Sequence, residues 1–212
     1  MGATAEASRP RTQAERTAES DARMLEAAIR LINERGTEKT TLKEVGELAG
    51  YSRGLAGYRF GSKGGLFAFV VKSIGEEWLR ELTRVTEGRS GLEALTAAAD
   101  AHRRFCVEAP DHVRAFYILW FESIGPGSGY RDVIAAIHER RQRDVVAWIR
   151  GGIEAGTIDP GVDPESVAAQ FCAAIIGIVY QWLLAPEDLA RVQRLYDDLN
   201  RTMTLLLEGT RP

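Results

Sequence analysis

The segment from residue 51 to residue 63 carries the side chains best suited to binding a nucleic acid. After Tyr51, three cations alternate with three hydroxyl residues: Ser52, Arg53, Tyr58, Arg59, Ser62 and Lys63. No Asp or Glu interrupts the segment. A short basic run is usually only a solvated surface, but guanidinium, ammonium and hydroxyl groups together suit phosphate oxygens and base edges. We therefore expect this segment to contact DNA.

Catalytic chemistry finds less support in the residue types. An enzyme needs a nucleophile, an acid/base pair or a metal site at a recognisable spacing. His102 and Cys106 lie four residues apart and are a possible metal pair, but no third or fourth ligand follows, so packing is favoured. Cys106 and Cys172 lie among apolar residues and are interpreted as buried thiols. We expect no enzyme activity, no metal and no cofactor.

The basic segment lies within a pattern of short helices. Thr41 precedes an apolar run and Glu44 follows three residues later, which is the spacing of a capping box. Gly50 ends that helix, Ser52 is expected to cap the next one, which runs to about Tyr58, and Ser62 the one after. Two helices joined by a tight turn form a helix-turn-helix, whose second helix enters the major groove.

The stretch resembles the DNA-binding domain of the TetR family of transcriptional regulators. The resemblance rests on Gly36, on the runs TTLKEVGELAG, YSRG and FGSKGGL, and on Phe60, Ser62, Lys63 and Leu66. Members commonly have Thr-Leu-Tyr after the motif Gly, where this chain has Leu55, Ala56 and Gly57, so an apolar base contact near Leu55 is expected. The DNA-binding candidates are Thr41, Ser52, Arg53, Leu55, Tyr58, Arg59 and Lys63.

Charge divides the chain into two parts. Residues 9–72 hold 12 Lys or Arg against 8 Asp or Glu, whereas residues 73–212 hold 15 against 21. A basic head on an acidic body suits a DNA-binding module joined to a domain with another task. We predict a disordered arm over residues 1–14, a DNA-binding domain over residues 15–68 and a regulatory domain over residues 69–212.

Apolar residues recur at helical spacing through the rest of the chain, and no alternating strand pattern appears. Helices are predicted at about residues 15–35, 62–87, 92–108, 111–124, 130–155, 164–185 (capped by Asp163) and 187–207, in addition to the two short ones. The fold class is therefore all-α, with a three-helix head and a six-helix body. The longest continuous apolar run, 171–180, is too short to span a bilayer, and no signal peptide is recognised, so a cytoplasmic protein is expected.

The family resemblance implies that the second domain binds a small effector and dimerises. Aromatic residues concentrate there, and most must form a helical core. The ligand-binding candidates are His102, Phe105, Phe116, Trp120, Trp148 and Phe171, which favour an apolar or aromatic ligand. The helix at about residues 164–185 has more apolar surface than one body can cover, and the last helix repeats a near-heptad apolar stripe. The homodimer candidates are Ala174, Ile178, Trp182, Val192, Leu195 and Leu199.

Together these expectations describe a ligand-responsive transcriptional regulator. It would bind a palindromic operator as a homodimer, act as a repressor and be released by a small molecule. The alternative is a DNA-binding regulator that is controlled by a protein partner or has no effector.

Overall fold

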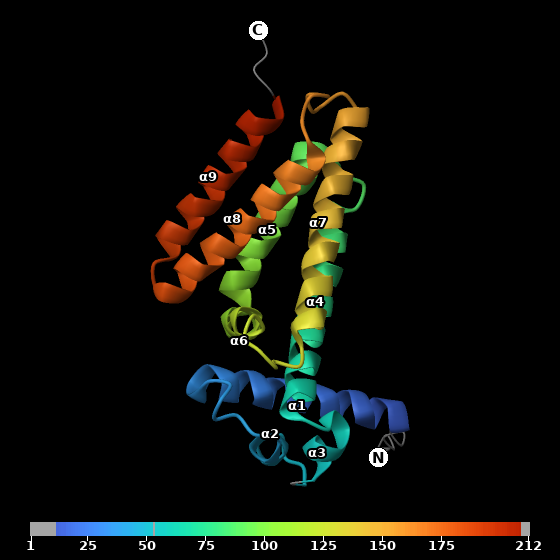
Figure 1. The fold of residues 1–212 in the computed structure, drawn as a ribbon, viewed down its shortest axis with the longest axis vertical. Coiled ribbons are helices and arrows are strands. Elements are labelled where there is room, and N and C mark those ends of the chain that lie inside the picture. Colours follow the sequence, from blue (N-terminus) through green and yellow to red (C-terminus); the bar gives the residue numbers. More distant parts are fainter. Residues whose placement is uncertain (1–11, 53, 209–212) are drawn as a thin grey trace, which may run out of the picture. The chain divides into compact units, whose positions relative to one another are not determined.

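The computed structural model describes residues 12–52 and 54–208, and all regular structure in these ranges is helical (Figure 1). The helices are α1 (Gln13–Arg35), α2 (Leu42–Leu48), α3 (Leu55–Phe60), α4 (Lys63–Thr86), α5 (Gly91–Glu108), α6 (Pro110–Glu122), α7 (Arg131–Glu154), α8 (Pro164–Leu184) and α9 (Leu189–Glu208). The chain divides after Leu66 into two compact units. The predicted all-α fold with an N-terminal helix-turn-helix is confirmed.

The first unit closes a small core between α1, α2 and α3. Met24, Ala28 and Ile32 form the buried stripe of α1, and Val45 of α2 and Ala56 of α3 are fully buried. Gly46 lets α2 and α3 approach closely, because a Cβ at this position would lie 3.2 Å from the Ser52 carbonyl oxygen. The tight turn therefore depends on a residue without a side chain.

The second unit is a helical body in which α5 packs on α7 and α9, and α8 packs on α7 and α9. Fully buried side chains in this core include Leu95, Leu119, Ile149 and Val179. Length and composition alone would let α8 cross a membrane, but 44% of its apolar window is buried inside the protein. A helix that packs on two neighbours requires that apolar character for its core contacts.

Helix ends show where local patterns are reliable. Asp163 caps α8 as predicted, since its Oδ1 accepts the Glu165 N–H at 3.2 Å. Ser62 likewise accepts the Gly65 N–H at 3.0 Å at the start of α4. The expected cap at Ser52 is wrong: Gly54 is the N-cap of α3 and makes no side-chain capping bond. The Ser52 carbonyl instead accepts the Leu55 N–H in the turn.

The start of α1 lies slightly earlier than predicted. Thr12 and Glu15 form a complete capping box, so Gln13 and Ala14 are helical rather than part of an arm. Residues 1–11 of the predicted arm lie outside the described residues. Gly75 within α4 is a close-packing glycine, because a Cβ there would lie 3.1 Å from the Ile137 Cδ1.

Candidate functional site

The helix-turn-helix presents α3 with one buried and one open face. Ala56 is fully buried, whereas the Tyr58 side chain is 90% exposed, so its ring and hydroxyl face solvent. Leu55 is half-buried and Ser52 is exposed. Thr41 is exposed but engaged, because its Oγ1 accepts the Glu44 N–H at 3.2 Å as the cap of α2. An exposed Tyr on a short recognition helix suits a DNA backbone contact.

Two of the predicted cations already have protein partners. Arg59 donates to both carboxylate oxygens of Asp21, with Nε 3.0 Å from Oδ1. Lys63 donates to the Glu38 carbonyl oxygen at 2.6 Å. Arg53 lies outside the described residues. A phosphate would therefore have to share or replace these partners of Arg59 and Lys63.

A buried polar cluster joins three helices of the second unit. His102 of α5 places Nδ1 2.8 Å from the Tyr196 hydroxyl of α9 and Nε2 3.3 Å from the Tyr117 hydroxyl of α6. The Cys106 Sγ lies 3.9 Å from His102 Nδ1. Burial, and secondarily the charge of Arg141, lowers the pKa of His102 to about 3. The imidazole is therefore neutral at physiological pH, with each ring nitrogen hydrogen-bonded to a tyrosine.

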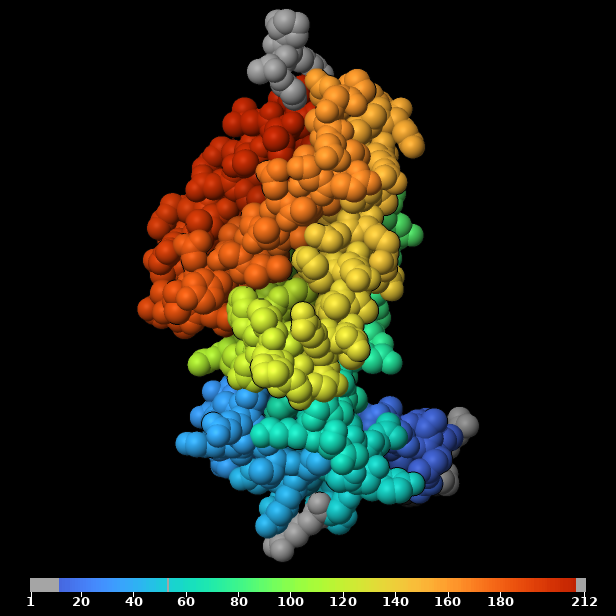
Figure 2. All heavy atoms as spheres, viewed as in Figure 1, coloured from blue at the N-terminus to red at the C-terminus, as the bar shows by residue number. Residues whose placement is uncertain are grey.

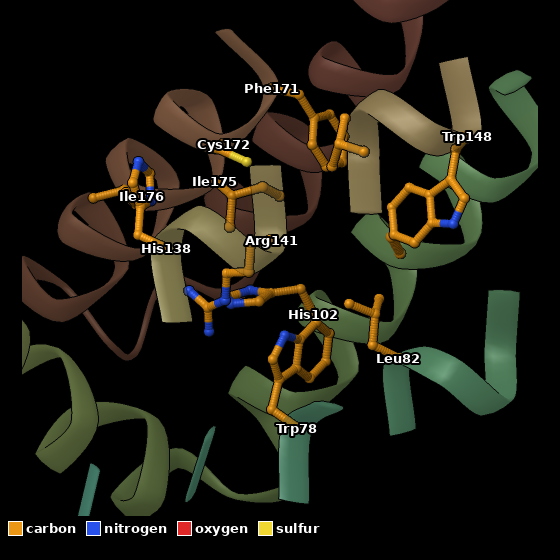
Figure 3. A pocket seen from close by; sticks show the side chains of 12 residues that line it. Trp78, Leu82, His102, His138, Arg141, Trp148, Phe171, Cys172, Ile175 and Ile176 are labelled. Carbon is orange, nitrogen blue, oxygen red and sulfur yellow. The ribbon is translucent and has the colours of Figure 1, made fainter. Parts of the chain in front are cut away.

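His102 also lines a small cavity of about 40 Å³ between α4, α5, α7 and α8, which is called the inner cavity below. In Figure 3, Trp78, His102 and Arg141 point toward one another, and Trp148 and Phe171 form other walls. A larger cleft of about 490 Å³ between α4 and α7 shares Trp78, Leu82 and Arg141 with the cavity. Clefts of this size accommodate drug-sized ligands.

The predicted ligand-binding residues fall into two groups. His102, Trp148 and Phe171 line the inner cavity. The other three lie behind it: Phe105 stacks on Trp78 at 5.6 Å, and Phe116 and Trp120 each face the Arg141 guanidinium at 5.4 Å. They shape the site through Trp78 and Arg141 and are not among the lining residues of either cavity.

The cavity residues that sequence reasoning missed include three with aromatic or charged side chains: Trp78, His138 and Arg141. A signal was available, because His138 and Arg141 share the inner stripe of α7 with Val145 and Trp148 at intervals of three or four residues. Burial, and secondarily Arg141, lowers the pKa of His138. A charged side chain on an otherwise apolar stripe is unusual unless it is paired or functional.

Burial contradicts four of the six predicted dimer residues. Ile178, Trp182, Val192 and Leu199 are buried within the chain itself, so they pack its own core and cannot present an interface. Ala174 and Leu195 are half-buried. The open faces of α8 and α9, which lie side by side in Figure 2, carry other apolar groups. Tyr180, Leu184 and Leu206 are 52%, 68% and 38% exposed.

Among residues 12–52 and 54–208, no three His, Cys, Asp or Glu side chains gather as metal ligands. Burial raises the pKa of the Cys106 thiol to about 12 and that of Cys172 to about 11. Both cysteines are free and buried. Their thiols therefore stay protonated and weakly nucleophilic near neutral pH.

The sequence is similar to known regulatory proteins. The family described as bacterial regulatory proteins, tetR family, matches residues 24–70. The probable HTH-type transcriptional regulator ArpR of Pseudomonas putida is 27% identical over 180 residues, covering 82% of this chain and 84% of its own. The HTH-type transcriptional regulator TtgR, also of Pseudomonas putida, is 26% identical over the same coverage.

Solved structures agree on the fold. A TetR transcription regulator from Haloarcula marismortui has a TM-score of 0.78 at 19% identity, covering 90% of this chain and 99% of its own. A putative transcriptional regulator from Saccharomonospora viridis, solved in complex with choline, has a TM-score of 0.76 at 20% identity, covering 90% and 98%. With the helix-turn-helix geometry, these similarities lead to one conclusion: residues 24–70 match the DNA-binding domain of the tetR family of bacterial regulatory proteins, and the chain as a whole is similar to HTH-type transcriptional regulators.

Proposed function

We propose that this regulator is a homodimeric, cytoplasmic repressor of a palindromic operator and that a small molecule releases it. The observation that carries the proposal is the inner cavity of the second unit, where apolar walls enclose polar groups. Ligand sites in proteins typically combine such walls with a few placed polar atoms. The DNA contacts are assigned to Thr41, Ser52, Arg53, Leu55, Tyr58, Arg59 and Lys63.

Helix α4 is the proposed route of coupling. It begins at Lys63, a proposed phosphate contact, and the part of it beyond Leu66 supplies Trp78 and Leu82 to both the cavity and the cleft. A ligand that favours one placement of α4 would change how two recognition helices of a dimer match successive grooves. The ligand must bind the released state better, by about 1–3 kcal/mol for typical coupling.

A titration tests this coupling directly. Operator DNA is first selected from random fragments with the purified protein, and compounds are screened through tryptophan fluorescence and thermal shift. The affinity of each hit is then measured with and without operator. Reciprocity requires that operator weakens ligand binding by the same factor, about 5–150-fold, by which ligand weakens operator binding. Equal affinities would favour a regulator controlled by a protein partner or by no effector.

A further inference from the structure

Among the described residues, Arg141 is a half-buried cation without a counterion that lines both the cavity and the cleft of the candidate ligand site. It forms no ion pair with any described carboxylate, unlike Arg143 with Glu139 and Arg150 with Glu165 on the same helix. Its Nε is buried and has no hydrogen-bond partner among the described residues. Its polar neighbours include two neutral groups, the Tyr117 hydroxyl and the imidazole of His102.

Aromatic rings hold the guanidinium in place. Its Cζ lies 5.4 Å from the ring centroids of both Phe116 and Trp120. Cation–π contacts recover part of the cost of removing a charge from water, but a half-buried cation without a counterion remains unfavourable. His138 adds a second unsatisfied atom to the cavity lining, because its Nδ1 is also buried without a partner in the described part of the chain. The site therefore leaves the Arg141 Nε–H without an acceptor and the His138 Nδ1 without a partner within these residues.

We infer that the ligand of this site is an organic acid, with a carboxylate or equivalent anionic group on Arg141 and an apolar body against Trp78 and Leu82. The inference rests on the proposed function and names the chemical class of its effector. Arg pairs with a carboxylate through two parallel N–H donors. His138 Nδ1 supplies a further polar contact in the same cavity.

The geometry fits this assignment and disfavours a cationic ligand. Trp78, Leu82 and Arg141 line both the 40 Å³ cavity and the 490 Å³ cleft. An anionic group on Arg141 would therefore lie between the two, and the apolar part of the ligand would have room in the cleft. The lining of the cleft also holds Lys72 and Arg140 and the acidic residues Glu76, Asp132 and Asp144. Arg141 is the charged residue of the inner cavity, and its guanidinium already occupies the faces of Phe116 and Trp120. A quaternary ammonium would meet repulsion there.

The test compares acids with their neutral amides on the full chain. The probe pairs are benzoate and benzamide, 2-naphthoate and 2-naphthamide, and decanoate and decanamide, with choline as the cationic probe. Binding is followed by tryptophan fluorescence and by isothermal titration with the wild type, Arg141→Met, Arg141→Lys and the control Arg143→Met. Arg143 is exposed on the same helix, so its replacement removes the same charge outside the site.

At least one acid is expected to bind the wild type tenfold or more tightly than its amide, and choline is expected not to bind. Arg141→Met should abolish this preference, Arg141→Lys should retain part of it, and Arg143→Met should leave it unchanged. Without ligand, Arg141→Met should melt no lower than the wild type, because an unpaired charge is replaced by an apolar chain. No acid binding better than its amide, or a preference that survives in Arg141→Met, would overturn the inference.

Operator binding is measured separately with each bound probe. An acid that binds through Arg141 without changing operator affinity contradicts the proposed function and leaves the anion site standing. A neutral amide that binds as tightly as its acid and releases DNA supports the proposed function and contradicts the anion site.

Discussion

Arg59 is held by Asp21 across the surface of the DNA-binding unit, so its availability to a phosphate depends on that ion pair. The two side chains are 42% and 26% exposed, and exposed pairs of this kind add little to stability, about 0–1 kcal/mol. Removing the carboxylate should therefore free the guanidinium with little effect on folding.

We predict that Asp21→Asn binds DNA more tightly and that Arg59→Ala binds all sequences more weakly. Each phosphate contact changes the salt dependence of binding by about one unit, so the two variants should shift it in opposite directions. Fluorescence anisotropy on operator and random DNA at several salt concentrations measures both effects. Glu34→Gln is the control, because it removes a carboxylate that pairs with Arg30 instead. If Asp21→Asn behaves like Glu34→Gln, Arg59 is no phosphate contact.

His102 should make the folded protein sensitive to acid. Its pKa is about 3 when folded, because burial excludes the charged form, and about 6.5 when unfolded. The unfolded chain therefore binds one more proton between these values. The stability tied to neutral His102 is fully present above pH 6.5 and is lost as pH falls toward 3, by up to about 1.4 kcal/mol per pH unit.

His102→Gln should flatten this dependence, since an amide can hydrogen-bond Tyr117 and Tyr196 but does not titrate. Urea unfolding at pH 7, 6 and 5 compares the slopes, and the wild type should lose about 2 kcal/mol more than the variant over this range. His112→Gln is the control, because it leaves His102 in place. Parallel slopes for His102→Gln and the wild type would show that burial of this imidazole does not set the acid sensitivity.

At this scale the sequence predicts type and burial better than role. The exposed position of Tyr58 agrees with its place in the helix-turn-helix motif. The cavity position of Trp148 agrees with its place on the inner apolar stripe of α7. The aromatic residues that indicate a ligand site do not point to Arg141, whose signal is that of a cation on an otherwise apolar helix face. Partners such as Asp21 for Arg59, 38 residues apart, depend on tertiary packing that no local spacing reveals.

Helix limits were predicted well wherever a cap and a periodic apolar stripe agreed, as for α8 with Asp163 and Pro164. They failed where two capping residues compete, as at Ser52 and Gly54, because tertiary contact between α2 and α3 decides the turn. Close helix packing at a glycine was also not predicted, since the sequence does not distinguish a glycine that ends a helix from one at which a neighbouring helix packs closely.

Two glycines inside helices of the second unit should therefore respond oppositely to alanine. A Cβ at Gly152 in α7 would lie 2.7 Å from the Gly91 Cα and 2.6 Å from the Ile158 Cδ1, so Gly152→Ala should destabilise by about 1–3 kcal/mol. Gly177 in α8 has no atom of the described chain within 4 Å of such a Cβ, and Gly177→Ala should stabilise by up to about 1 kcal/mol. Urea unfolding of both variants checks the contrast, and equal effects would refute the packing argument.

At the scale of the whole molecule, the open faces of α8 and α9 are the proposed dimer interface. Tyr180→Glu and Leu206→Glu should give monomers that bind operator poorly, because each places a charge on an apolar face while leaving the core intact. Sedimentation velocity measures the oligomeric state. Leu48→Glu, on the DNA-binding unit and 44% exposed, is the control and should sediment as the wild type does. Unchanged dimers in both interface variants would exclude this surface.

The 2.8 Å hydrogen bond between His102 and Tyr196 has a consequence for a dimer. Tyr196 belongs to α9, so the wall of each cavity lies one hydrogen bond from the helix proposed to meet the other subunit. A ligand that moves His102 in one subunit would then change the ligand affinity of the empty site in the other subunit. Effector binding should show a Hill coefficient different from one, and Tyr196→Phe should bring it toward one by making the two subunits respond independently.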